Sequence, residues 1–327
     1  MTKYLNYATL DGMYLKIFIL ILLLLIPQNS FAFWVWTPET NRWVNPKYEV
    51  KETPQEQLAY VKEIFDTKEY KKAVEEANKL IKNYPKAREA ADAQYYIGLS
   101  QETQGQLYEA FKSYQVIVDK YPFSDRAPEI VKRQYEIGNQ LMEGDEQKNA
   151  FMDAMAGGDY NIVEVFRKVI KNAPYGELAA PSQYKIGLYL LGKQLYQEAR
   201  DELEKVINDY PDSEWAKAAK YQVALSDSKR STGAQYDQAI TQSAVKEFEK
   251  FVEHYPDAEL SDKAQKEIQS LREKEAENNF LVAQFYEKQK NYQAAKIYYN
   301  TIVEDFKNTS WAVKSLEKIR SLSSKVQ

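Results

Sequence analysis

Six segments of this chain repeat one arrangement of small, apolar and aromatic residues, and the repetition constrains the fold more than any single residue does. Gly98 lies 24 residues before Pro122, and Gly187 lies 24 residues before Pro211. Between these positions, apolar residues recur three and four places apart, which is the spacing of an amphipathic helix. Proline disfavours helical geometry at the preceding residue, so we expect the second helix of each copy to end before its proline.

This arrangement resembles the tetratricopeptide repeat (TPR), a two-helix unit of about 34 residues. The positions equivalent to the closing proline are 85, 122, 174, 211, 256 and 307, and their spacing shows that three copies carry insertions. The resemblance implies an all-α fold, a right-handed TPR solenoid of about six helix pairs with a C-terminal capping helix. The expected pairs lie near residues 54–84, 88–121, 126–173, 177–210, 213–255 and 258–306, and the capping helix lies near 309–322. Such a solenoid presents a long surface that binds other proteins.

Small and aromatic residues of the repeats are expected to pack the helices together. The small residues that would let two helix backbones approach closely are Gly98, Ala110, Gly187 and Ala199. Most of the 26 tyrosines lie in the predicted helices, where their rings would fill the space between helices while their hydroxyls reach polar partners. No glycine or proline follows residue 256, so the first helix of the last pair is expected to run from Glu259 to Lys288.

The N-terminus resembles an export signal. It contains an unbroken apolar run from Ile17 to Ile26, and Ser30 and Ala32 supply small residues at the two positions that a signal peptidase reads. A helix over this run would be roughly 15 Å long, about half the thickness of the hydrocarbon core of a membrane. Residues 1–32 are therefore predicted to be a cleaved signal peptide rather than a spanning anchor.

Residues 33–53 form a segment rich in tryptophan. Trp34 and Trp36 alternate with a valine, and Trp43 follows a turn-forming stretch, which suggests a short β-hairpin. An isolated hairpin is only marginally stable in water, so these rings are expected to be buried, either on the first repeat or against a partner protein or a membrane surface. Disorder is the remaining alternative. The TPR domain would then span residues 54–327, with a proline in the first turn of its first helix.

The composition gives no sign of catalytic chemistry. The chain has no cysteine, which excludes disulfides, thiolate metal sites and a cysteine nucleophile. The only histidine, His254, lies at a predicted helix end, where a cation interacts favourably with the helix dipole. The 44 basic and 48 acidic residues are interspersed, so no basic stripe indicates nucleic acid. We therefore expect no enzyme activity, no cofactor, no metal site and no nucleic-acid partner.

The last repeats resemble a known family more closely. The matching stretches are Ala244 to Phe248, Phe251 to Pro256, Phe280 to Tyr286 and Asn291 to Ala295. Over roughly residues 213–306 the chain resembles BamD, the lipoprotein family of the outer-membrane β-barrel assembly machine. The resemblance implies an exported, periplasmic scaffold at the inner face of the outer membrane. Its expected partners are β-barrel assembly subunits and unfolded outer-membrane protein segments.

Some features depart from that family. The chain lacks the cysteine that carries the family's lipid, and it has an extra repeat near its start and a single closing helix at its end. Peripheral membrane contact would then depend on the tryptophan-rich segment or on a partner. Two other interpretations remain open. A periplasmic TPR adaptor similar to the CpoB cell-division coordinator would bind a different partner, and an enzyme would need a cluster of titratable groups in the insertions.

A candidate binding face follows from the helix pattern of the first two repeats. The residues that pack the first helices leave the opposite side to Lys62, Asp92, Tyr95 and Glu102. This side is expected to line the inner surface of the solenoid, where charged groups and one aromatic ring would hold an extended peptide. The predicted partner-binding residues are these four together with Trp34, Trp36 and Trp43.

Overall fold

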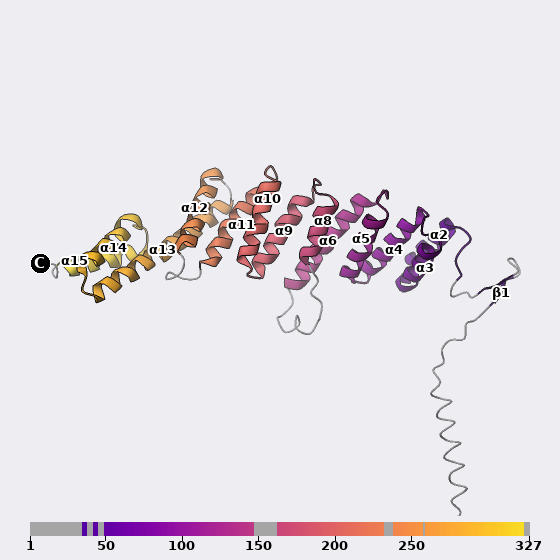
Figure 1. The fold of residues 1–327 in the computed structure, drawn as a ribbon, viewed down its shortest axis with the longest axis horizontal. Helices are drawn as coiled ribbons and strands as arrows, with labels where there is room; N and C mark the ends of the chain where they lie inside the picture. Colours follow the sequence, from indigo (N-terminus) through magenta and orange to yellow (C-terminus); the bar gives the residue numbers. More distant parts are fainter. Residues whose placement is uncertain are drawn as a thin grey trace, which may run out of the picture. The chain divides into compact units, whose positions relative to one another are not determined.

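The computed structural model describes residues 35–37, 42–44, 49–146, 162–231, 238–257 and 259–323. The chain divides into two compact units, Met1–Tyr96 and Ile97–Gln327. Helices dominate the described part of both units (Figure 1). The predicted signal peptide, residues 1–32, and Trp34 lie outside the described residues.

The described helices follow the predicted order of six pairs and one closing helix. The first helices of the pairs are α2 (Pro54–Asp66), α4 (Glu89–Thr103), α6 (Ala127–Glu146), α9 (Ala179–Gly192), α11 (Glu214–Arg230) and α13 (Glu259–Lys288). The second helices are α3 (Tyr70–Asn83), α5 (Leu107–Lys120), α8 (Ile162–Asn172), α10 (Tyr196–Asp209), α12 (Gln238–His254) and α14 (Tyr292–Asp305). The closing helix is α15 (Ser310–Ser323). The predicted all-α TPR architecture is therefore confirmed.

The first unit contains a hairpin and the first helix pair. The strands β1 (Val35–Thr37) and β2 (Arg42–Val44) pair antiparallel. A capping box starts α2, since the Thr53 hydroxyl accepts a hydrogen bond from the Glu56 N–H at 3.2 Å and the Thr53 N–H donates to the Glu56 carboxylate at 3.3 Å. Helix α2 then packs on α3 through fully buried apolar side chains such as Val61 and Leu80. Local capping and apolar burial thus both favour this first pair.

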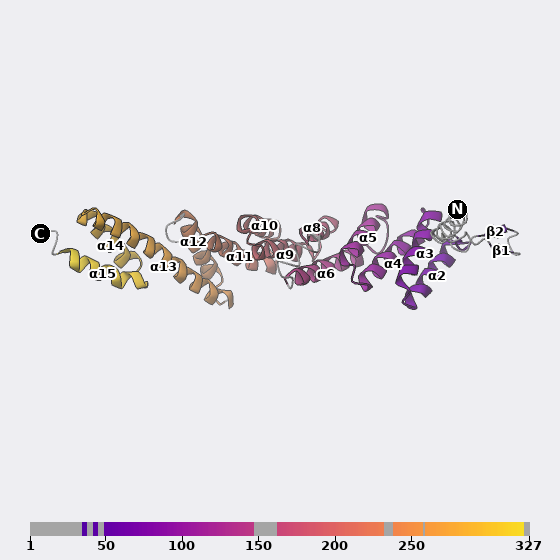
Figure 2. The ribbon, with the colours of Figure 1, turned by 90° about the horizontal axis from the view of Figure 1, so that it is seen from below.

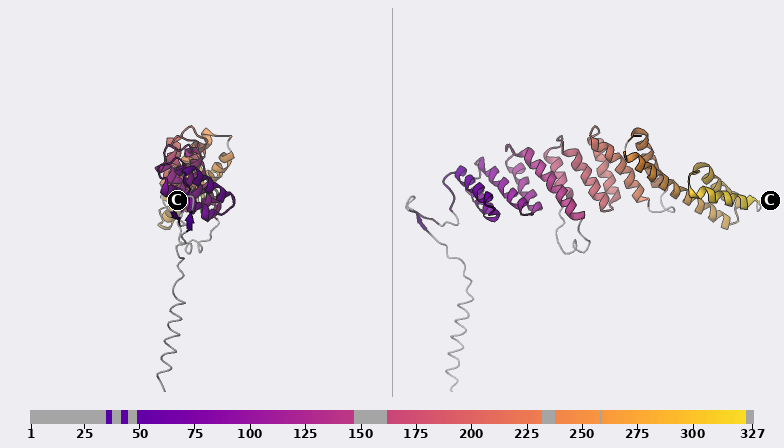
Figure 3. Two further views of the ribbon diagram at one scale, coloured as in Figure 1. Left: turned by 90° about the vertical axis from the view of Figure 1, so that its right-hand side faces the viewer. Right: turned by 180° about the vertical axis from the view of Figure 1, so that it is seen from behind.

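In the second unit each helix packs against the next one in the chain. Contacts join α5 to α6, α6 to α8, and every later pair of neighbours through to α15 (Figure 3). Such nearest-neighbour packing is the arrangement of a repeat protein, in which each unit buries its apolar face only against adjacent units.

Among the described glycines, three make room for a large side chain of the partner helix. A Cβ at Gly98 would lie 2.5 Å from the Tyr114 ring, one at Gly187 would lie 2.5 Å from Leu203, and one at Gly138 would lie 2.8 Å from Phe166. The expectation that two helix backbones approach at Gly98 and Gly187 is therefore corrected. The group that approaches is a buried side chain of the second helix rather than its backbone, so the glycine acts as a socket.

Helix α13 is shared by two core clusters, and its predicted span is confirmed (Figure 2). At 1.5 Å per residue its 30 residues give a length of roughly 45 Å. Leu271 belongs to the cluster with α11 and α12, whereas Phe280 belongs to the cluster with α14 and α15. The wide spacing of the last two repeats therefore comes from one continuous helix that serves both.

Candidate protein-binding surfaces

An open groove in the first unit brings together two of the predicted face residues. We call it the first groove, and its volume is about 420 Å³. Its lining residues are Gln55, Leu58, Ala59, Lys62, Arg88, Glu89 and Asp92. They come from α2, from the start of α4 and from the residue before α4, so two successive first helices form the groove. Lys62 and Asp92 therefore lie at one surface, as the helix pattern predicted.

The first groove combines an apolar base with charges of both signs. Leu58 is buried between the helices, whereas Lys62 is exposed. The Gln55 side-chain amide donates a hydrogen bond to the Glu89 carboxylate at 2.7 Å, which joins α2 to α4 across the groove. The Lys62 ammonium lies 6.0 Å from the centroid of the Tyr96 ring. This arrangement suits a ligand that carries both polar backbone groups and apolar side chains.

The other two predicted face residues have internal contacts. Tyr95 is only 6% exposed, and its ring makes an edge contact with Tyr96 at 5.7 Å. The prediction that Tyr95 offers a ring to a ligand is wrong, because α4 buries residues around most of its circumference. The Glu102 carboxylate accepts a hydrogen bond from the Tyr114 hydroxyl at 2.6 Å and pairs with Arg133 at 3.2 Å. Glu102 thus joins α4 to α5 and α6.

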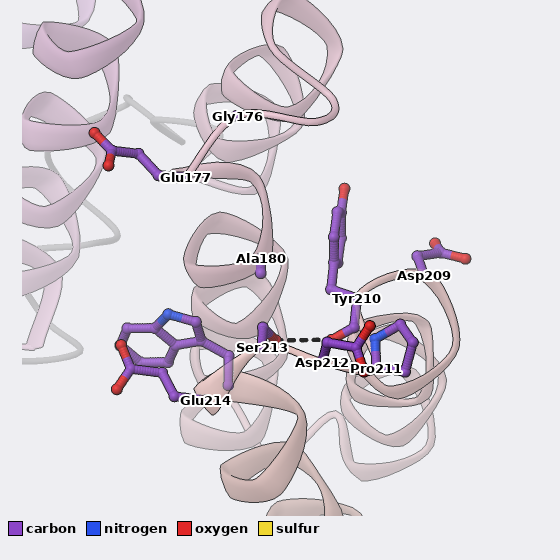
Figure 4. A pocket seen from close by; sticks show the side chains of 10 residues that line it. Gly176, Glu177, Ala180, Asp209, Tyr210, Pro211, Asp212, Ser213 and Glu214 are labelled. Carbon is purple, nitrogen blue, oxygen red and sulfur yellow. Dashed lines mark hydrogen bonds between the residues drawn. The ribbon is translucent and has the colours of Figure 1, made fainter.

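A second groove lies in the second unit, where the start of α9 meets the turn between α10 and α11 (Figure 4). We call it the second groove, and its volume is about 430 Å³. The residues that line it are Gly176, Glu177, Ala180, Asp209, Tyr210, Pro211, Asp212, Ser213, Glu214 and Trp215. The sequence reading missed this groove, because its sides come from turns of two different repeats.

Hydrogen bonds and ring contacts fix the shape of the second groove. The Ser213 hydroxyl donates to the Tyr210 carbonyl at 2.8 Å, the bond drawn in Figure 4, and accepts from the Ala216 N–H at 3.2 Å as the cap of α11. The Tyr210 hydroxyl donates to the Pro174 carbonyl at 3.3 Å. The Trp215 ring lies 5.2 Å from the Tyr184 ring. Both aromatic rings of the groove are therefore held in position.

Burial and negative charge perturb one group of the second groove. Partial burial, together with the charges of Asp209 and Tyr175, raises the pKa of Tyr210. A tyrosine is protonated at neutral pH in any case, so the shift extends to higher pH the range in which the phenol donates to the Pro174 carbonyl.

The tryptophan hairpin leaves two rings partly open to solvent. Trp36 stands opposite Trp43 in the strand pairing, and their rings make an edge contact at 5.7 Å. Trp36 is 42% exposed and Trp43 is 63% exposed. These exposures disfavour burial of the two rings on the first repeat, which was one of the alternatives expected from the sequence. A partner or a membrane surface is the alternative that this exposure favours.

The described residues contain little that resembles a reactive centre. Among them, no group of three or more His, Cys, Asp or Glu side chains could hold a metal ion. His254 is exposed at the end of α12, with its Nδ1 atom 2.8 Å from the Lys250 carbonyl, as expected for a helix-end residue. Within the same residues, no helix has the length and apolar content needed to cross a membrane.

Family comparisons agree with this geometry. Residues 92–124 match a model described as "Tetratricopeptide repeat", and residues 174–325 match the YfiO model, described as "Outer membrane lipoprotein". The chain therefore has the fold of tetratricopeptide-repeat proteins. Its C-terminal part is similar to the family described as "Outer membrane lipoprotein", and the matched region is wider at both ends than the resemblance over residues 213–306 had indicated.

Similar solved structures are also TPR proteins. A thermophilic TPR protein from Thermus thermophilus is 16% identical, with 66% of this chain and 99% of that chain covered and a TM-score of 0.32. The C-terminal part of a TPR repeat-containing protein from Cytophaga hutchinsonii is 16% identical, with 81% and 88% covered and a TM-score of 0.37. YrrB, described as a TPR protein with an unusual peptide-binding site, is 14% identical, with 64% and 90% covered and a TM-score of 0.33. TM-scores this low give no information about ligands. No curated protein matches the chain.

Proposed function

We propose that this protein is an exported, non-enzymatic scaffold that takes part in outer-membrane β-barrel assembly. The observation that carries the proposal is the match of residues 174–325 to the family described as "Outer membrane lipoprotein". The TPR fold supports a scaffold role, since stacked helix pairs present extended surfaces to other proteins. The proposed location is the periplasm, at the inner face of the outer membrane.

In this proposal the first groove holds an extended segment of a partner or of an unfolded substrate. Such a segment brings unpaired N–H and C=O groups that need polar partners. Lys62 would donate to a carbonyl or carboxylate of the ligand, Asp92 would accept from an N–H or a basic group, and Leu58 would contact an apolar side chain at the base of the groove. The two charge signs of the groove thus match the two ends of each peptide dipole.

We further propose that the tryptophan hairpin helps to attach the protein to a membrane surface or to a partner protein. Trp36 and Trp43 expose large rings next to polar backbone, which is the chemistry of residues at membrane interfaces and in protein contacts. Trp34, which precedes β1, is proposed to extend this contact. The hairpin would replace the lipid anchor that the cysteine-free chain cannot carry on a thiol.

Charge reversal in the first groove tests the ligand proposal. Lys62→Glu should weaken the binding of a labelled peptide from an outer-membrane barrel strand by about 1 kcal/mol, or roughly fivefold, measured by fluorescence anisotropy. Lys71→Glu is the matched control, because Lys71 is an exposed lysine on α3 outside the groove. Unchanged affinity in Lys62→Glu, or equal affinity for peptides from soluble proteins, would contradict the substrate role.

A crosslinked pull-down of the full chain from cell envelopes tests the cellular role. Recovery of β-barrel assembly subunits is the expected result. Recovery of cell-division proteins without those subunits would favour the CpoB-like adaptor instead. Recovery of the protein in the cytoplasmic fraction would overturn both interpretations.

A further inference from the structure

We propose that the second groove binds a basic segment of a partner protein through carboxylates and aromatic rings. This surface belongs to the second unit and shares no residue with the first groove. The inference does not depend on a role in β-barrel assembly, because it follows from the chemistry of the groove alone.

The charges that line the second groove all have one sign. Its carboxylates are Glu177, Asp209, Asp212 and Glu214, and no lysine or arginine is among its lining residues. Among the residues that the structure describes, none of these four carboxylates forms a hydrogen bond or an ion pair. The first groove differs, because Lys62 and Arg88 accompany its acidic residues. The second groove therefore offers unpaired negative charge to a cationic ligand.

Helix capping explains only part of this negative charge. Glu214 lies in the first turn of α11 and Glu177 lies just before α9, where a negative charge interacts favourably with the helix dipole. Asp209 is instead the last residue of α10, where negative charge is unfavourable, and the last turn of α10 has no basic residue to offset it. A bound cation would relieve this unfavourable placement.

Aromatic rings accompany the carboxylates inside and beside the groove. Tyr210 (Figure 4) and Trp215 line it, and both rings are held by contacts within the protein. Tyr175 immediately precedes the lining residue Gly176 and is 100% exposed. Phe123 occupies the equivalent position after the closing proline of an earlier repeat and is 98% exposed. Four other copies place lysine, aspartate or asparagine there, at Lys86, Asp212, Asp257 and Asn308.

These groups together match an arginine or lysine on a protein rather than a free small cation. A guanidinium or ammonium group pairs with carboxylates and also stacks over aromatic faces. The fully exposed Tyr175 ring beside the groove would be unused by a small cation, whereas a protein segment could cover it and bury apolar area. The ligand class is therefore a surface segment that carries a basic residue next to apolar ones.

Binding of a short peptide rich in arginine and leucine to the full chain tests the proposal. The double variant Asp209→Asn, Asp212→Asn should lower affinity about tenfold or more, as expected for lost charge-assisted hydrogen bonds. Tyr175→Ala should lower it roughly two- to fivefold, the effect of one exposed cation–π contact. The matched control Glu198→Gln, Asp201→Asn removes the same charge from α10 outside the groove and should keep wild-type affinity.

Several results would overturn the proposal. One is equal loss of affinity in the groove variant and the control, which would reflect general attraction to an acidic protein. Another is equal binding of a peptide in which glutamate replaces every arginine. Binding of spermine at the groove without binding of the peptide would overturn the assignment to a protein segment. None of these results involves Lys62. A failure of the second-groove proposal can therefore be distinguished from a failure of the proposed function.

Discussion

The socket at Gly98 allows a stability prediction with a defined magnitude. Replacing this glycine by alanine places a Cβ 2.5 Å from the Tyr114 ring. The ring is fully buried, and its hydroxyl donates to Glu102 at 2.6 Å, so it cannot swing aside without losing that bond. Overpacking of a core costs about 1–3 kcal/mol, whereas alanine in place of glycine gains about 1 kcal/mol of helix propensity. The two effects oppose each other, so the free energy of unfolding of Gly98→Ala should fall by up to about 2 kcal/mol.

Gly144→Ala provides the matched control. Gly144 lies in α6, and a Cβ there would meet nothing within 4 Å. That variant should gain about 0.5–1 kcal/mol from helix propensity alone. Urea denaturation followed by far-ultraviolet circular dichroism measures both variants, with equal m-values as the check that the comparison is valid.

A specific outcome would refute the socket argument. In the last helix pair, Ala283 and Tyr299 belong to one core cluster and stand 16 residues apart, as Gly98 and Tyr114 do. That pair therefore tolerates a Cβ at the equivalent position. The socket argument is refuted if Gly98→Ala and Gly144→Ala change the free energy of unfolding by the same amount. In that case α4 and α5 would have adjusted to the arrangement of α13 and α14, and the close contact at Gly98 would not constrain the fold.

Two buried carboxylates should respond to pH in opposite directions. Burial alone would raise the pKa of Glu202, but hydrogen bonds from Lys205 and Gln183 outweigh it and the pKa is lowered. Stability from Glu202 is therefore present above its unfolded pKa and is lost as pH falls, so urea midpoints of the wild type should drop relative to Glu202→Gln below about pH 4.5. Burial raises the pKa of Glu275 against the opposing charge of Arg272. The wild type should therefore lose stability relative to Glu275→Gln as pH rises above about 4.5, and parallel pH profiles for wild type and variant would contradict either assignment.

Helix boundaries could be predicted from the sequence because local signals determine them. The capping box at Thr53 and the Tyr-Pro pairs at the ends of second helices act within a few residues. The span of α13 followed in the same way from the absence of glycine and proline. The paired strands around Trp36 and Trp43 also follow a local signal, the alternation of residues about a short turn.

The face of α4 could not be predicted, because this helix has no single apolar stripe. Ala90, Ala93, Tyr95 and Ile97 are all buried, so burial extends around the helix. A helix that packs on more than one side loses the periodicity that would identify its free face. The exposure of Lys62 on α2 was predictable by contrast, since α2 keeps its buried residues at helical spacing.

The second groove could not be predicted from the sequence either, for a different reason. Glu177 and Asp212 lie in turns of different repeats, and only the packing of α9 against α10 and α11 brings them together. Each acidic residue alone is typical of a solvent-exposed turn. What distinguishes them is that neither carboxylate has a basic partner among the described residues, which is a property of the packed structure.

The charge of the two grooves leads to different expectations for their ligands. The charged side chains that line the second groove are all negative, so the groove attracts a basic segment over a long range. This attraction should weaken steeply as salt shortens the Debye length. The first groove carries Lys62 and Arg88 with Glu89 and Asp92, so its net field is small and its contacts act only at short range. A protein that uses both surfaces would therefore recruit one ligand by charge and retain the other by local fit. Salt dependence of binding thus reports which groove a given partner occupies.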